Sequence, residues 1–172
     1  KKIMCGITGL FDFVNKSVSS QTIEKMNKQL IHRGPDGEGV WATKNIGLGH
    51  RRLSVIDLSD LAAQPMKSKD ERYLLTYNGE VYNYLTLRKE LERLGHKFYS
   101  NSDTEVVLNA LIQWGEKAIT KFNGMFAFAF YDRADNTLLL ARDRYGIKPL
   151  YYSHSHSKLI FASEQKAISC VL

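Results

Sequence analysis

The chain has 172 residues, 44% of them hydrophobic and 24% charged, which is enough for one globular domain with a buried core and excludes a disordered chain. The formal net charge is +6, but the basic residues are scattered along the chain, which argues against a nucleic-acid partner. No apolar run approaches the roughly 18 residues of a membrane span. With only Cys5 and Cys170 a disulfide framework is excluded, so we expect a cytoplasmic protein.

The first half of the chain is predicted to contain mostly strands. Residues 3–14 are predicted to form a buried strand. Ser20 is expected to cap a helix, because Ile23, Met26 and Leu30 follow at helical spacing. Three more strand-like runs cover residues 39–42, 48–56 and 73–77.

Two amphipathic helices are predicted in the middle of the chain, and strands after them. Apolar residues at helical spacing between Tyr84 and Leu94 predict the first helix, which Gly95 can terminate. Ser102-Asp103-Thr104-Glu105 is a capping-box pattern that opens the second. The remaining strand-like runs are 125–132 and 137–143, with a hairpin turn at 133–136, and then 150–153 and 158–163. Strands outnumber helices and form hairpins, which predicts an α+β fold in which helices cover antiparallel sheet.

Two motifs contain residues suited to holding a charged ligand. In HRGPDGEGVW, residues 34–37 are predicted to form a turn, with glycines that permit positive φ. In GHRRLSVID, Arg51 and Arg52 would face opposite sides of a strand, so at most one of them can grip a ligand carboxylate in a given pocket. The alternative for either arginine is an ordinary surface position.

A third motif, YNGEVYNY at residues 77–84, contains a potential oxyanion site. The side-chain amide of Asn78 and the N–H of Gly79 could donate two hydrogen bonds to one developing oxyanion. The alternative is an ordinary Asn-Gly turn. Asp103, similarly, either belongs to a helix cap or also holds a ligand amine.

The start of the chain, KKIMCG, raises a further question. If Met4 is a translation start, its removal exposes Cys5 as the first residue, with a thiol and a free α-amine on the same residue. Residues 1–4 would then be a leader or an expression remnant in front of a domain at 5–172.

Taken together, the motifs resemble the class II glutamine amidotransferase domain, and most closely that of glutamine-hydrolysing asparagine synthetases. The resemblance covers residues 4–167 and rests on MCGITG, HRGPDG, GHRRLSVIDLS, AAQPM, YNGEVYNY, NSDTEVVL, NGMFAFAFYD and ARDRYGIKPLYY. It implies an N-terminal nucleophile hydrolase fold, a four-layer αββα sandwich with two antiparallel sheets.

The resemblance also implies roles for individual residues. Cys5 matches the nucleophile, Asn78 and Gly79 match the oxyanion hole, Arg52 matches the residue that binds the glutamine α-carboxylate, and Asp103 matches the residue that binds its α-ammonium. Further glutamine contacts are expected from Leu53, Ser54, Val55, Ile56 and Glu80.

The implied reaction is attack of the thiolate on the glutamine side-chain amide, with release of ammonia and hydrolysis of the thioester to glutamate. The α-amine of Cys5 would act as base. The domain needs no metal or cofactor; ATP and Mg²⁺ are expected only in a C-terminal synthetase domain that this chain lacks. The ammonia acceptor and homodimer formation stay open. Two alternatives remain: another class II branch serving amino-sugar or purine synthesis, and an inactive glutamine-binding module whose thiol never becomes N-terminal.

Overall fold

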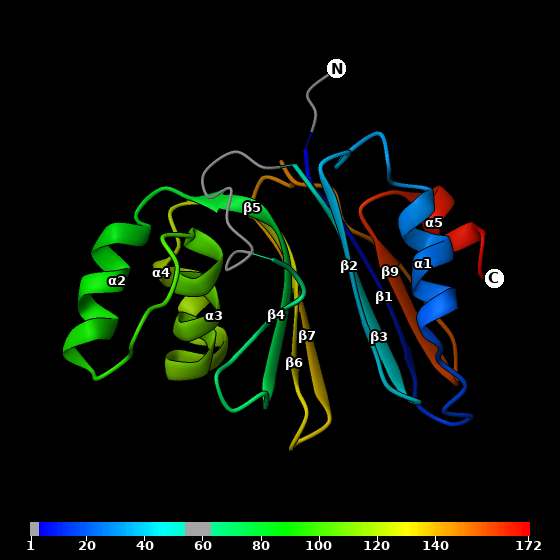
Figure 1. Ribbon diagram of the computed structural model, residues 1–172, viewed down its shortest axis with the longest axis horizontal. Coiled ribbons are helices and arrows are strands. Elements are labelled where there is room, and N and C mark those ends of the chain that lie inside the picture. The colour runs from blue at the N-terminus through cyan, green and yellow to red at the C-terminus, as the bar shows by residue number, and fades with distance from the viewer. Residues whose placement is uncertain (1–3, 54–62) are drawn as a thin grey trace.

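Two antiparallel sheets pack face to face in this protein, with a layer of helices outside each (Figure 1). The computed structural model describes residues 4–53 and 63–172. The first sheet contains, in spatial order, β2 (Gly37–Ala42), β3 (Ile46–Arg52), β1 (Gly6–Asp12), β9 (Lys158–Ala162) and β8 (Tyr151–His154). The second contains β4 (Met66–Lys67), β5 (Tyr73–Val81), β6 (Gly124–Asp132) and β7 (Thr137–Arg142). The predicted α+β class and its antiparallel sheets are confirmed.

The helices cover the outer faces of the two sheets (Figure 1). The first sheet is covered by α1 (Ser20–Lys28) and α5 (Gln165–Ser169). The second is covered by α2 (Tyr84–Arg93), α3 (Asp103–Trp114), the short 3₁₀ helix η2 (Gly115–Lys117) and α4 (Ala118–Lys121). No helix within the described ranges is long and apolar enough to span a bilayer.

Every residue of β1 is buried, because both faces of this central strand are covered. Successive side chains of a strand point to opposite faces. Leu10 packs with Ile23 and Met26 under α1, whereas Phe11 packs with Leu74 of the second sheet. The apolar N-terminal run is therefore the middle of the sandwich.

The predicted elements are confirmed in type within the described residues, with differences at their ends; residues 3 and 54–56 of the predicted strands lie outside the described residues. The first helix is capped by Ser19 and not by Ser20, because the Ser19 hydroxyl accepts the N–H of Thr22 at 3.2 Å. Gly95, with φ of 95°, ends α2 as expected. Four short elements within the described ranges, β4, η2, α4 and α5, were not predicted, because their apolar positions are too few to show a period.

The capping box at α3 forms only in part. The Ser102 hydroxyl accepts the N–H of Thr104 at 3.0 Å. Glu105, however, accepts the backbone N–H groups of Tyr99 at 2.9 Å and Ser100 at 2.7 Å instead of that of Ser102. The loop before α3 is thereby fastened to the first turn of the helix, which fixes where Asp103 lies.

The predicted turn at residues 34–37 is wrong in its position and in the role of its glycines. The chain turns earlier, where the N–H of Arg33 donates to the carbonyl of Leu30 at 2.9 Å, and neither Gly34 nor Gly37 has positive φ. A Cβ at Gly34 would lie 2.4 Å from the carbonyl carbon of Arg51. Glycine is needed here for close approach of two backbones.

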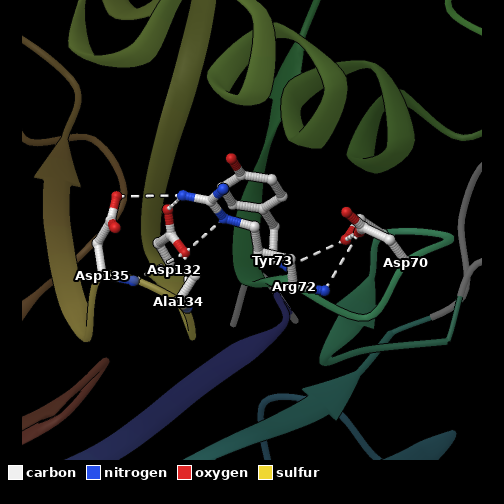
Figure 2. Close-up of polar contacts among 7 residues, drawn as sticks. Asp70, Arg72, Tyr73, Asp132, Ala134 and Asp135 are labelled. Carbon is white, nitrogen blue, oxygen red and sulfur yellow. Dashed lines mark hydrogen bonds and ion pairs between the residues drawn. The ribbon is translucent and has the colours of Figure 1, made fainter.

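One end of the second sheet is held by an ion-pair network around Arg72 (Figure 2). The guanidinium contacts both carboxylate oxygens of Asp132, at 2.9 and 2.6 Å, and a carboxylate oxygen of Asp135 at 3.1 Å. The Arg72 hydrogen bond and charge lower the pKa of Asp132. Arg72 precedes β5 and Asp132 ends β6, so this network fixes the register between these two strands. Asn78 lies in β5, and the register sets its partner in β6.

Two polar contacts join the sheets across their interface. The Thr76 hydroxyl donates to the carbonyl of Gly49 at 3.0 Å, and Nε2 of His50 donates to the carbonyl of Tyr77 at 3.1 Å. Burial lowers the pKa of His50 to about 4, and the charges of Arg52 and Arg51 act in the same direction. His50 is therefore neutral in the folded protein, and its pKa is about 6.5 once the chain unfolds.

We expect His50 to make the protein sensitive to acid. The unfolded chain binds a proton at His50 below about pH 6.5, whereas the folded protein does so only near pH 4, so stability is lost as the pH falls between these values. The full loss is about 3 kcal/mol. His50→Gln, which retains a donor for Tyr77 but does not titrate, should flatten the pH dependence in denaturant titrations. His154→Gln, at an exposed position, is the matched control and should leave the dependence unchanged.

Candidate active site

Cys5 lies directly in front of β1 and is half-buried. The register that pairs Gly6 with Arg51 brings Cys5 to the last residues of β3. There the N–H of Leu53 donates to Sγ at 3.3 Å, and Sγ lies 3.6 Å from the carbonyl oxygen of Leu53. The thiol is therefore held by backbone atoms that are 48 residues away in the chain.

Arg33, in the segment that connects α1 to β2, fixes the backbone of Cys5. Its Nε donates to the Cys5 carbonyl at 3.0 Å, and its Nη1 contacts Glu164 at 3.1 Å. The Arg33 side chain is buried. Two residues after Cys5, the N–H of Ile7 donates to the hydroxyl of Ser163 at 3.0 Å. The HRGPDG motif indicated a turn and a family resemblance, but its spacing did not predict this contact between Arg33 and Cys5.

Arg51 and Arg52 have different environments, as alternation along a strand predicts. Arg51 is buried: its Nε donates to the Gly34 carbonyl at 2.9 Å, and its Nη1 pairs with Glu38 at 3.1 Å. Arg52 is half-buried at the end of β3, and its charge lowers the pKa of the Cys5 thiol. Arg51 is thus part of the framework, and Arg52 lies on the side of the nucleophile.

Asn78 and Gly79 lie in β5, paired with Ala127 and Phe126 of β6. Asn78 shares a face of its strand with Thr76, which contacts the first sheet, and β5 packs against both β1 and β3. Its amide nitrogen Nδ2 is buried without a hydrogen-bond partner among the described residues. A buried unpaired donor is costly and calls for an explanation, and a ligand oxygen would provide one. The simple hairpin turn that we considered for this dipeptide is excluded, because both residues are in mid-strand.

Asp103 is the first residue of α3 and is 5% exposed. Its Oδ2 accepts the hydroxyl of Tyr77 at 2.8 Å and the N–H of Val81 at 3.0 Å. Burial raises the pKa of Asp103, and the charge of Glu80 raises it further, while these two hydrogen bonds oppose the shift. The carboxylate is therefore held rigidly beside Glu80, next to the segment that contains Asn78.

The thiol is coupled to its surroundings by charge. Burial raises the pKa of Cys5, and the Leu53 N–H and the charges of Lys148 and Arg52 partly offset that rise. A thiolate at Cys5 in turn contributes to the raised pKa of Tyr77, after burial and Asp103. Cys5 precedes β1 of the first sheet, whereas Tyr77 is in β5 of the second and its partner Asp103 is in α3, so charges on these separate elements affect one another.

The sequence profile of the glutamine amidotransferase domain family matches residues 4–172, almost the whole chain. The chain belongs to this family.

Curated relatives of this amidotransferase domain are named as asparagine synthetases. The glutamine-hydrolysing asparagine synthetases 1 and 3 of Bacillus subtilis are 44% and 46% identical to it, each over 96% of the chain. The asparagine synthetase B of Escherichia coli is 38% identical over 96% of the chain. The domain spans only about a quarter of the two Bacillus proteins, 26% and 27% of their lengths.

Solved structures support the fold. The glutamine phosphoribosylpyrophosphate amidotransferase of B. subtilis superposes with a TM-score of 0.81 over 97% of this chain and 43% of that one, at 22% identity. This likeness supports the arrangement of two antiparallel sheets between helix layers that the resemblance implied. The family, the likeness to asparagine synthetase and the four-layer sandwich predicted from the sequence are confirmed.

The structure brings most of the predicted site residues to the same end of the sandwich. Cys5, Arg52 and Leu53 meet where β1 begins and β3 ends. Asn78, Gly79 and Glu80 lie in β5 of the second sheet, and Asp103 lies at the start of α3. Ser54, Val55, Ile56 and residues 1–3 lie outside the described residues. Arg33, Tyr77 and Lys148, which contact or polarise these groups, are the residues that sequence reasoning missed.

The two neighbouring arginines should respond differently to alanine substitution. Arg52→Ala should weaken glutamine binding by about 2–4 kcal/mol, because the resemblance assigns to this guanidinium the α-carboxylate of glutamine, which would lose its charged partner. Arg51→Ala should lower the melting temperature instead, because Gly34 and Glu38 lose their partner. Calorimetric titration of glutamine in a Cys5→Ala background and a thermal melt separate the two effects. A larger binding loss in the Arg51 variant would reverse our assignment.

Proposed function

We propose that this domain hydrolyses the side-chain amide of L-glutamine to glutamate and ammonia through a thioester on Cys5. The supporting observation is the convergence of a thiol, an unpartnered buried amide donor at Asn78 and two opposite charges, Arg52 and Asp103, at one end of the sandwich. A ligand with an amide to attack and a zwitterionic end to hold fits this set of groups.

The reaction begins with transfer of the Cys5 thiol proton to the α-amine of the same residue, once that amine is free. The two groups have ordinary pKa values of about 8.5 and about 7.7–8.0, close enough for exchange near neutral pH. Sγ then attacks the side-chain carbonyl carbon, the carbon–nitrogen bond breaks, and the α-ammonium returns its proton to the departing ammonia. Water finally hydrolyses the thioester and releases glutamate.

Asn78 and Gly79 would stabilise the oxyanion that forms in each step. The side-chain N–H of Asn78 and the backbone N–H of Gly79 are the two donors of this proposal. A Cβ at Gly79 would lie 2.6 Å from the Met125 carbonyl oxygen and 2.8 Å from the Tyr77 ring. Only glycine therefore allows the strand to pass so close to its neighbours at the oxyanion site.

Arg52 and Asp103 would select the amino-acid end of glutamine. A guanidinium is suited to a bidentate grip on the α-carboxylate, and the Asp103 carboxylate to an α-ammonium. The Tyr77 hydroxyl and the Val81 N–H both donate to Oδ2 of Asp103, which would hold the carboxylate in one orientation for the α-ammonium. Glu80 and the backbone at 53–56 would add contacts, those at 54–56 lying outside the described residues.

We further propose that the ammonia passes to an ATP-dependent synthetase region of the parent protein, which would bind ATP and Mg²⁺. The support is the naming of the relatives, which are glutamine-hydrolysing asparagine synthetases about four times as long as the matched segment. A second solved structure is titled as the allosteric regulatory enzyme of purine biosynthesis, but at 22% identity both structures support the fold alone. A nucleotide loop of the SGGxDS kind after residue 172 of the parent sequence would favour the synthetase branch.

A coupled assay of glutamate and ammonia tests the proposed reaction. A chain that begins at Cys5 should release both products from glutamine in equal amounts. Asn78→Ala should lower kcat by roughly 100-fold with a smaller effect on KM, because the donor is used mainly in the transition state. Asn45→Ala, whose amide contacts Asn136 on the surface, is the matched control and should retain full activity. An unchanged kcat in the Asn78 variant would remove Asn78 from the mechanism.

A further inference from the structure

Glu164, the residue before α5, does not cap that helix with its side chain. An N-cap side chain ordinarily accepts a backbone N–H of the first turn, but Glu164 makes no such bond. Its Oε1 instead accepts from Nη1 of Arg33 at 3.1 Å and from Nε2 of His32 at 2.9 Å. Its Oε2 lies 3.4 Å from Nζ of Lys166. The carboxylate therefore joins the start of α5 to the segment between α1 and β2, 131 residues earlier in the chain.

Arg33 depends on this carboxylate for its position. In the part of the chain that the structure describes, the guanidinium has two hydrogen-bond partners: Nε donates to the carbonyl of Cys5 at 3.0 Å, and Nη1 donates to Glu164. Nη2 is buried and has no hydrogen-bond partner there. Because Arg33 is only 9% exposed, loss of Glu164 would leave a buried charge unpaired, which is costly. The guanidinium would then move toward water or another acceptor and release the Cys5 carbonyl.

The Glu164 carboxylate is charged in the folded protein. Burial raises its pKa, but the hydrogen bonds from His32 and Arg33 together outweigh burial, and the pKa of Glu164 is lowered overall. A hydrogen bond between a carboxylate and a guanidinium is roughly twice as strong as one between neutral groups. The pair between Arg33 and Glu164 is therefore suited to holding a side chain in one place.

We propose that Glu164 is a positioning residue for the nucleophile: it holds Arg33, and Arg33 holds the backbone of Cys5. The proposed reaction uses both the thiol and the α-amine of Cys5, so a shift of its backbone displaces both groups at once. Reacting atoms must approach within about 3–3.5 Å in a defined orientation, and a misplacement of about 1 Å can cost about 100-fold in rate. The contribution of Glu164 to glutamine hydrolysis rests on the proposed function, whereas its effect on the position of the Cys5 carbonyl does not.

A second pair of arginine and glutamate, of almost the same geometry, provides a matched control. Arg51 also donates through Nε to a backbone carbonyl, that of Gly34 at 2.9 Å, and its Nη1 pairs with Glu38 at 3.1 Å. The side chain of Glu38 is 35% exposed and that of Glu164 is 27% exposed, so the two carboxylates are comparably hydrated. Substitution of Glu38 therefore removes a similar ion pair without releasing the carbonyl of Cys5.

Carbonyl NMR tests the position of Cys5 without any substrate. Because the chain has two cysteines, cysteine labelled with ¹³C at its carbonyl carbon gives two signals, which Cys170→Ala assigns. Glu164→Ala should move the Cys5 signal upfield, as Arg33→Ala should, because a carbonyl that loses its guanidinium donor is less polarised. Glu164→Gln, which keeps an oxygen for Nη1, should return the signal toward its original position, and Glu38→Ala should leave it unmoved.

Steady-state kinetics of a chain that begins at Cys5 give the second readout. Glu164→Ala should lower kcat roughly 10-fold with a smaller effect on KM, because it displaces the nucleophile and not the groups proposed to bind glutamine. In an Arg33→Ala background the same substitution should lower kcat no further, since Glu164 acts through Arg33. Glu38→Ala should lower the melting temperature and leave kcat unchanged.

An unmoved Cys5 signal in a folded Glu164→Ala protein would overturn the inference, as would an equal loss of kcat in the Glu38 variant. If the alanine variant does not fold, Glu164→Asp replaces it and should give the same upfield shift, because its carboxylate is one methylene further from Nη1. If no variant forms glutamate but the Cys5 signal moves, the proposed function fails and the positioning of Cys5 stands. Normal glutamate release by Glu164→Ala with an unmoved signal has the opposite meaning.

Discussion

Replacing Cys5 by alanine should abolish the release of glutamate from glutamine while glutamine still binds. The substitution removes the attacking thiol and leaves in place Arg52 and Asp103, the charged groups proposed to hold the amino-acid end of glutamine. The loss is expected to be complete within detection, because no other cysteine in the described ranges lies at this end of the sandwich. Cys170 follows α5, and its Sγ lies 3.2 Å from the carbonyl oxygen of Ala167. Product release and calorimetric binding are the two measurements.

Cys170→Ala is the matched control for this experiment and should retain full activity. An electrophilic glutamine analogue, such as a diazoketone, should label Cys5 and spare Cys170. Labelling chiefly at Cys170, or glutamate production by the Cys5 variant, would contradict the assignment of the nucleophile.

The second large effect concerns the four residues before Cys5. A chain that retains Lys1–Met4 should fold but release little or no ammonia, because the nitrogen of Cys5 is then part of an amide and cannot act as base. Met4 would also obstruct the site, since its side chain is half-buried against Lys148. A version that begins at Met4 should have normal activity. Aminopeptidases remove an initiator methionine when the next residue is small, as cysteine is, so Cys5 becomes the first residue.

The comparison requires two preparations whose N-termini are confirmed by intact mass. Ammonia release is measured in both, and the thermal melts should agree, because Met4, the one leader residue that the structure describes, is not among the buried core residues. Full activity with the leader attached would show that another group is the base. Such a result would leave Cys5 as the nucleophile and remove the α-amine from the mechanism.

Local patterns in the sequence were sufficient to predict most of the elements. Alternating and helical periods identified β1, β5, β6, β7, α1, α2 and α3, and the Arg133–Asn136 turn identified the β6–β7 hairpin. These features depend on residues within one element, so the chain alone contains the signal. The four-layer arrangement came from the resemblance to a family, because no period specifies which sheet faces which.

The sequence by itself also placed Arg51 and Arg52 on opposite faces, through the two-residue repeat of a strand. It did not show what either arginine contacts. Arg51 bonds to Gly34 and Glu38 because β2 and β3 pair in one particular register, and a register is a property of two strands.

Only the tertiary structure decided which groups surround the nucleophile. Arg33 reaches the Cys5 carbonyl across 28 residues, the Leu53 N–H reaches its thiol across 48, and Lys148 reaches Met4 across 144. Such contacts arise when separate elements pack, and their partners depend on crossing angles and loop shapes that no local spacing contains. The sequence therefore determined the chemistry available to the site, and the packing of the two sheets determined which of those groups act together.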